Sequence, residues 1–238
     1  MIFFFEMSFF NPEIPIFSRK QSADAIPDMP GVWRIHWCIG ERTLWSSFYT
    51  RHDQACMLWS FLTAGIFAIA QFLPLSWTVQ AIFSSVLTLF GVAGMVGLTW
   101  YFAQVERLNW VLYSWIALML VGIFVTDLAL FQHWGGVLLN VCPLWLGLSG
   151  IGYCITGIGM RSRMFILLGL LHGLAIWLLP LVAPWQQLTT GLVISLSVLS
   201  MAELQWDANG VCGYQTVAAE TPSEVQPLYI SNSPILET

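Results

Sequence analysis

The stretch MFILLGLLHGLAIWLLPLVA, residues 164–183, decides the fold of this chain. It is continuously apolar apart from His172, and it has the length that an α-helix needs to cross roughly 30 Å of hydrocarbon. A helix satisfies its backbone hydrogen bonds internally, whereas a strand of a membrane barrel would alternate polar and apolar residues. The stretch therefore predicts a transmembrane helix.

The rest of the chain repeats this pattern. Hydrophobic residues make up 57% of the 238 residues and charged residues only 9%, whereas about a quarter of the residues of a soluble protein are charged. We therefore predict an all-α, polytopic integral membrane protein built as a six-helix transmembrane bundle. The predicted spans are residues 56–75, 79–103, 108–131, 135–160, 164–183 and 188–204.

The basic residues predict how the chain is threaded. In membrane proteins lysine and arginine are concentrated in the cytoplasmic loops. Six predicted spans place all eight basic residues on one side and none in the three opposite turns, so both termini are expected in the cytoplasm (N-in/C-in). A bacterial inner membrane and a photosynthetic internal membrane both fit. The eight residues are Arg19, Lys20, Arg34, Arg42, Arg51, Arg107, Arg161 and Arg163.

Two segments lie outside the predicted spans. Residues 1–55 form a cytoplasmic or interfacial segment, in which GVWRIHWCIGER (31–42) alternates apolar and polar residues. The alternation fits a hairpin that turns at Gly40–Arg42, or a tryptophan-rich segment at the headgroups, and the second interpretation is favoured. Residues 205–238 are predicted to be a disordered acidic cytoplasmic tail. The opening MIFFFEMSFF lacks the features of a signal peptide and leaves Met1 or Met7 as the initiator.

Small residues recur at helical spacing in three spans. In lipid, small residues let helix backbones approach closely, and this close packing holds membrane helices together. The pattern predicts packing within the bundle, which we favour over dimerisation because six helices have many neighbours of their own. The glycines are Gly91, Gly94 and Gly97, then Gly147, Gly150 and Gly157 (with Cys154 on the same stripe), and finally Gly169 and Gly173.

His172 is the one histidine placed deep in a predicted span, and ionisable groups at such depth are costly enough to suggest a role. Three roles are open: a hydrogen bond between helices, ligation of a haem or chlorophyll metal, and proton relay or transport. No second histidine lies at comparable depth to complete a bis-histidine haem site. A polar contact between helices is favoured, and we expect no cofactor.

Polar residues at the predicted outer level form a second candidate binding group. Asp127 and Asn140 are expected at similar depth, with Gln71 and Gln80 near the same level and His133 in the adjoining turn. Such a group could bind a cation or solute. The favoured interpretation is that Asp127 and His133 simply reach the water at the headgroups.

Four residues near the predicted inner face carry zinc-type ligands: His36, Cys38, His52 and Cys56. Their spacing matches no standard zinc motif, so no metal site is expected. Walker A, GxSxG, HExxH and CxxCH motifs are absent from the sequence, and we predict no enzymatic activity. The net charge of −5 also gives no support for nucleic-acid binding.

These observations predict a non-enzymatic multi-pass membrane protein that acts as an assembly, scaffold or accessory subunit. Its expected partners are the lipid bilayer and other membrane protein subunits. One alternative is a small-solute or ion transporter that uses Asp127, Asn140 and His172. The other is a protein that binds a tetrapyrrole, haem or chlorophyll, at His172.

Overall fold

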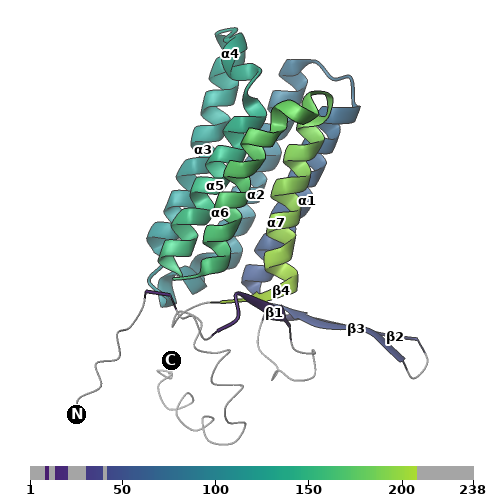
Figure 1. Cartoon of the computed structure of the whole chain (residues 1–238), viewed down its shortest axis with the longest axis vertical. Coiled ribbons are helices and arrows are strands. Elements are labelled where there is room, and N and C mark those ends of the chain that lie inside the picture. Colours follow the sequence, from purple (N-terminus) through teal and green to yellow (C-terminus); the bar gives the residue numbers. More distant parts are fainter. Residues whose placement is uncertain (1–8, 11–13, 21–30, 40–41, 208–238) are drawn as a thin grey trace, which may run out of the picture.

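The computed structural model describes residues 9–10, 14–20, 31–39 and 42–207. The initiator choice, the Gly40–Glu41 part of the predicted turn and the predicted tail from residue 208 onward lie outside these residues. Figure 1 shows a bundle of long helices with short strands at one end, which we call the base. The helices are α1 (Arg51–Phe72), α2 (Trp77–Val105), α3 (Asn109–Phe131), α4 (Gly135–Leu138), α5 (Val141–Gly159), α6 (Arg163–Leu178) and α7 (Gln186–Glu203), with a 3-10 segment η2 (Leu179–Trp185) between α6 and α7.

Five helical stretches in the described chain are long and apolar enough to cross a membrane. The protein is therefore mostly helical and of the membrane-spanning type, as predicted. The fifth stretch, Arg163–Glu203, contains α6, η2 and α7, and the chain reverses direction at η2 (Figure 1). Pro180 and Pro184 explain this reversal, because a proline lacks the N–H that a continuing helix requires.

Several helix boundaries differ from the boundaries of the predicted spans. The first helix begins at Arg51 and not at residue 56, because Thr50 and Asp53 form a capping box around its first turn. The predicted span 135–160 is interrupted after Leu138, and α5 begins at Val141 with Pro143 in its first turn. Proline is tolerated at such a position because the amide that it lacks would have no partner inside the helix. The predicted span 164–183 ends as an α-helix at Leu178.

The long helices form a ring. Helix α1 packs along α2, α2 along α3, α3 along α5, and α5 touches α7, which returns to pack along α1. Helix α6 lies outside this ring and packs mainly along α5. This arrangement leaves one surface of α5 facing the inside of the ring and another facing α6.

Glycines make the contact between α5 and α6, which we call the α5–α6 seam. A methyl group added at Gly169 would lie 3.0 Å from the carbonyl oxygen of Gly150, and one at Gly150 would lie 3.2 Å from the carbonyl oxygen of Gly169. A methyl group at Gly157 would lie 2.7 Å from the Ile166 side chain and 3.0 Å from the Ile166 backbone nitrogen, and one at Gly147 has only Ile176 near it, at 3.9 Å. The seam is thus a place of direct backbone approach.

The other glycines of the predicted stripes differ in their surroundings. Gly91 and Gly94 of α2 pack against Trp59 and Leu58 of α1. Gly97 and Gly173 are exposed, and a methyl group added at either would have no other group within 4 Å. Small residues therefore serve packing inside this chain at some positions of a stripe and face outward at others.

Buried carboxylates hold the base together. Strand β1 (Phe17–Arg19) pairs antiparallel with β4 (Leu204–Trp206), which follows α7 directly. Asp207 accepts hydrogen bonds from the Ser162 hydroxyl, the Arg163 guanidinium and the backbone amides of Arg163 and Met164. Elsewhere in the base, Lys20 forms an ion pair with the buried Asp53, with 2.7 Å between Nζ and Oδ2.

The base corrects the predicted boundary of the tail at residue 205. Residues 205–207 belong to the folded part, because β4 pairs with β1 and Asp207 caps the start of α6. The N-terminal segment takes part as well, since the Arg163 guanidinium donates to the carbonyl of Ile14. A segment that precedes the first helix and one that follows the last helix thus meet beneath the bundle.

Strands β2 (Trp33–Ile39) and β3 (Arg42–Tyr49) form an antiparallel hairpin at the base. The hairpin alternative is therefore present in the structure, and its pairing leaves the interfacial interpretation open. Trp33 pairs with Tyr49 and Trp37 with Trp45, and the register shifts between Trp37 and Cys38. Figure 1 shows the hairpin extending sideways from the bundle.

Candidate ligand cavity in the helix bundle

A cavity of about 220 Å³ lies within the helix ring. Its walls come from α1, α2, α3, α5 and α7, with Phe165 of α6 at one end, and most of the lining surface is apolar. By the same measure a single water needs only about 10–15 Å³. The cavity is therefore large enough for an organic molecule, and its apolar walls favour one that is mainly hydrocarbon.

The cavity is long and narrow. Along α1 the lining residues run from His52 to Ala70, a separation of about 27 Å at 1.5 Å per helical residue. Along α2 they run from Trp77 to Ala103, most of the length of that helix. A volume of about 220 Å³ spread over this length suits a single extended chain better than a wide, flat ring system.

Hydroxyl groups that line the cavity are mostly satisfied by their own helices. Thr63, Ser84, Thr88, Thr99 and Thr156 each donate to a backbone carbonyl one turn earlier, at 2.7 or 2.8 Å. These hydroxyls therefore have no proton left for a ligand. The walls offer oxygen atoms and methyl groups, which is compatible with an apolar occupant.

Aromatic rings gather at the base end of the cavity. His52, Phe102 and Phe165 line it there, and Trp206 of β4 packs against His52 and Phe165 with ring centroids 5.8 and 4.9 Å apart. Trp206 is positioned by the pairing of β4 with β1. The folded base therefore supports the aromatic end of the cavity.

His172 is fully buried but is not among the residues that line the cavity. Its Nδ1 lies 2.8 Å from the carbonyl oxygen of Leu168 in the same helix, and its ring lies 4.9 Å from that of Tyr153, which does line the cavity. Its Nε2 has no hydrogen-bond partner among the described residues. His172 is thus packed behind Tyr153, against the α5–α6 seam.

The predicted outer-level binding group is not gathered into one site. Asp127 accepts a hydrogen bond from Ser85 across the contact between α3 and α2, and the Asn140 side chain donates to the carbonyl of Gly136. His133 is exposed in a turn with a φ of 54°. Gln71 instead ties α1 to Pro184 and Leu188 at the reversal between α6 and α7.

The four zinc-type residues form two separate pairs. Cys38 Sγ lies 3.0 Å from His36 Nε2 on the exposed hairpin, and Cys56 Sγ lies 3.7 Å from His52 Nε2 inside α1. No group of three or more histidine, cysteine or acidic side chains suited to a metal is found in the described part of the chain.

Sequence reasoning missed the cavity itself. One local signal was available: Ala81, Ser84, Ser85 and Thr88 follow one face of α2, among bulky apolar residues, and all four line the cavity. A stripe of small and hydroxyl residues is equally typical of close helix packing. The sequence pattern fits either role, and only the arrangement of the helices in a ring shows that this stripe lines a cavity.

No protein-family model, curated protein or solved structure matches this chain. The cavity and its surroundings therefore carry the functional inference alone.

Proposed function

We propose that this chain is a multi-pass membrane protein that holds an elongated apolar molecule, such as a single acyl or isoprenoid chain, inside its helix ring. The observation that carries the proposal is the long apolar cavity of about 220 Å³. Apolar walls that face an unfilled space forgo dispersion contacts with neighbouring atoms. An apolar occupant recovers such contacts, and a dry apolar cavity is known to favour them.

In this proposal α6 and α7 each cross the membrane, giving six spans with both termini in the cytoplasm. The reversal at η2 supports two separate crossings, and the arginines of the turns at the base support the orientation. Arg107 and Arg161 both lie in turns next to the base, where they adopt positive φ values. The type of membrane stays as predicted from the sequence.

The cavity favours chain-like ligands over the tetrapyrrole alternative. His172 lies behind Tyr153 and outside the lining, so a metal held in the cavity would not meet its imidazole in this arrangement. The transporter alternative has no shared site to support it, because Asp127, Asn140 and His172 bond to different partners. The role of an accessory or assembly subunit stays a prediction, and such a subunit could carry an apolar molecule.

A matched pair of variants tests the proposal. Ser149 of α5 is buried and lines the cavity, whereas Ile151, two residues later, is 52% exposed on the outside of the bundle. Ser149→Phe fills the cavity and Ile151→Phe changes only the outer surface. The protein is purified in a mild detergent, and its bound organic molecules are extracted and quantified by mass spectrometry.

We expect the original protein and Ile151→Phe to retain a distinct apolar molecule at a fixed ratio to protein. Filling the cavity should lower that amount about tenfold, the effect of a penalty near 1.4 kcal/mol. A photoreactive alkyl diazirine should crosslink to lining residues in the original protein and lose those crosslinks in Ser149→Phe. The proposal fails if all three proteins carry only the lipids of the surrounding membrane, in the same proportions.

A further inference from the structure

The β2–β3 hairpin has one apolar face. Side chains alternate between the two faces of a strand, so Trp33, Ile35 and Trp37 share one face of β2, and Trp45 joins them from β3 opposite Trp37. These four side chains are 57%, 41%, 66% and 46% exposed in that order. The bundle itself therefore leaves this face largely uncovered.

The opposite face of the hairpin is mainly polar, although Phe48, which pairs with Arg34, is buried on this face beside the bundle. Arg34, His36 and Cys38 alternate with the apolar residues of β2, and His36 Nδ1 lies 3.3 Å from the hydroxyl oxygen of Ser46 on β3. The Cys38 thiol also contacts His36 on this face. The hairpin is thus amphipathic, with indole rings on one side and polar side chains on the other.

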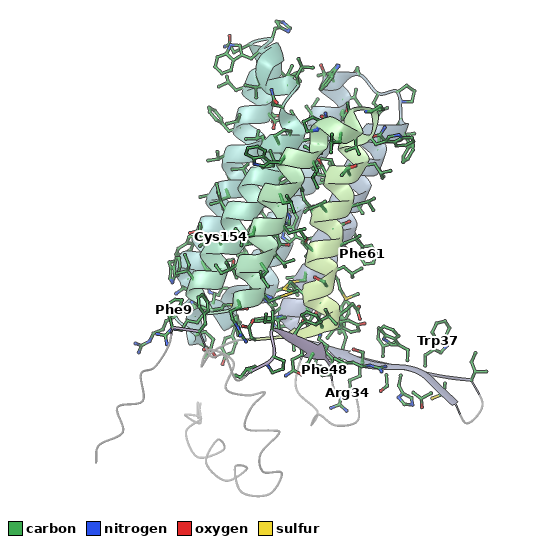
Figure 2. All side chains as sticks on the ribbon, in the orientation of Figure 1. Phe9, Arg34, Trp37, Phe48, Phe61 and Cys154 are labelled. Carbon is green, nitrogen blue, oxygen red and sulfur yellow. The ribbon has the colours of Figure 1, made fainter. Side chains whose placement is uncertain are left out.

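The position of the hairpin relates its two faces to the bundle. It extends sideways from the base, across the direction of the long helices (Figure 1). In Figure 2, Trp37 lies on the side of the hairpin that is nearer to the helices, and Arg34 lies on the opposite side. Phe61, on the outer surface of α1 above the hairpin, is 69% exposed. The apolar face of the hairpin and the apolar outer surface of α1 therefore form the two sides of a corner.

A two-stranded hairpin is at best marginally stable in water unless its apolar face is covered. Lipid that contacts α1 at Phe61 would continue onto the tryptophan face of the hairpin. Indole rings favour the boundary between headgroups and acyl chains, and arginine favours the phosphates beside it. The composition and the placement of the two faces agree with a bilayer surface as the covering layer.

We propose that the β2–β3 hairpin lies flat in the headgroup layer at the base, with Trp33, Trp37 and Trp45 toward the acyl chains and Arg34 and His36 toward water. In this arrangement the bilayer surface covers the apolar face of the hairpin. This proposal is independent of the ligand in the cavity, because none of these residues lines it.

Neighbouring positions on the two faces provide a matched test. In the full-length chain with its other four cysteines replaced by alanine, a nitroxide spin label is attached to the native Cys38. A second protein carries Trp37→Cys together with Cys38→Ala. Both are reconstituted into liposomes, and power-saturation EPR measures the collision of each label with oxygen, which concentrates in lipid, and with a water-soluble nickel chelate.

We expect the ratio of oxygen to nickel collisions to be severalfold higher at position 37 than at position 38. Ile35→Cys and His36→Cys, each combined with Cys38→Ala, provide a second pair that retains every tryptophan, and they should show the same difference. Equal ratios, with nickel reaching both faces, would overturn the proposal and place the hairpin in water. Protection of position 37 from both reagents, increasing with protein density in the liposomes, would overturn it in favour of a second copy of the chain.

Discussion

The base and the α5–α6 seam hold the molecule together by opposite means. At the base, one buried carboxylate, Asp207, accepts four hydrogen bonds at 2.8–3.1 Å. At the seam, Gly150 and Gly169 bring two backbones close together, with the side chains of Cys154 and His172 beside them. The base joins a segment that precedes the first helix to one that follows the last helix, whereas the seam joins two consecutive long helices.

The difference follows from the surroundings of each region. Charged groups are costly inside hydrocarbon, so buried ion pairs belong at the ends of the helices, where the chain leaves the bilayer. Inside the bilayer, apolar side chains gain little by leaving lipid, and close packing supplies the stability. Three substitutions test this division, and each is measured as the free energy of unfolding in mixed micelles.

The largest effect is expected for Asp207→Ala. The change removes all four hydrogen bonds, leaves the amides at the start of α6 without their acceptor and leaves the Arg163 guanidinium with the Ile14 carbonyl as an acceptor but no carboxylate. Because breaking a largely buried pair typically costs 3–5 kcal/mol, we expect a loss of about 3 kcal/mol. Asp207→Asn retains one acceptor oxygen and should lose less. An Ala variant as stable as the original protein would show that the base contributes little.

A somewhat smaller loss is expected for Gly169→Leu at the seam. Even the first carbon of the new side chain would clash with the Cys154 sulfur and lie 3.0 Å from the carbonyl oxygen of Gly150, so α5 and α6 must separate. Overpacking of this kind costs about 2 kcal/mol. Gly173→Leu, one turn later and facing outward, is the control, and it should be neutral or slightly stabilising because leucine favours helix more than glycine. Equal losses in the two variants would contradict the division.

The smallest effect is expected for Tyr49→Phe, where the hairpin joins the bundle. The Tyr49 hydroxyl donates to Glu203 at 2.9 Å, and its loss should cost about 1 kcal/mol. Burial raises the pKa of Tyr49 above its ordinary value of 10.0, and Glu203 raises it further. The unfolded chain therefore loses this proton first, so the stability that depends on the protonated hydroxyl declines as the pH rises above 10. Tyr49→Phe should lack this part of the pH dependence; an unchanged alkaline profile would exclude Tyr49 as its source.

Most of the helices could be predicted because the tendency to form a membrane helix depends mainly on the residues within that stretch of sequence. A continuous apolar run such as residues 164–183 carries its own evidence for a membrane helix, and five such stretches are confirmed. The boundaries were less predictable. The first helix starts earlier because Asp53 caps it, and the span predicted over 135–160 breaks before Val141.

The candidate site was much less predictable. His172 attracted attention as an ionisable group in an apolar run, but it lies behind Tyr153 rather than in the cavity. Ser84 and Thr88 carried no distinctive chemistry, yet they line the cavity. A cavity depends on which helices become neighbours around a ring, and this information is not present in the periodicity of any single helix.

By itself, the amino-acid sequence determined that this chain is of the membrane-spanning type and which stretches are mainly helical, because hydrophobicity over about 20 residues is sufficient to favour a membrane helix. Only the tertiary structure decided that Asp207 closes onto Ser162 and Arg163 and that β1 meets β4 beneath the bundle. It alone placed an apolar cavity inside the ring. The physical reason is that these contacts join residues far apart in the chain, and their energies depend on the whole fold.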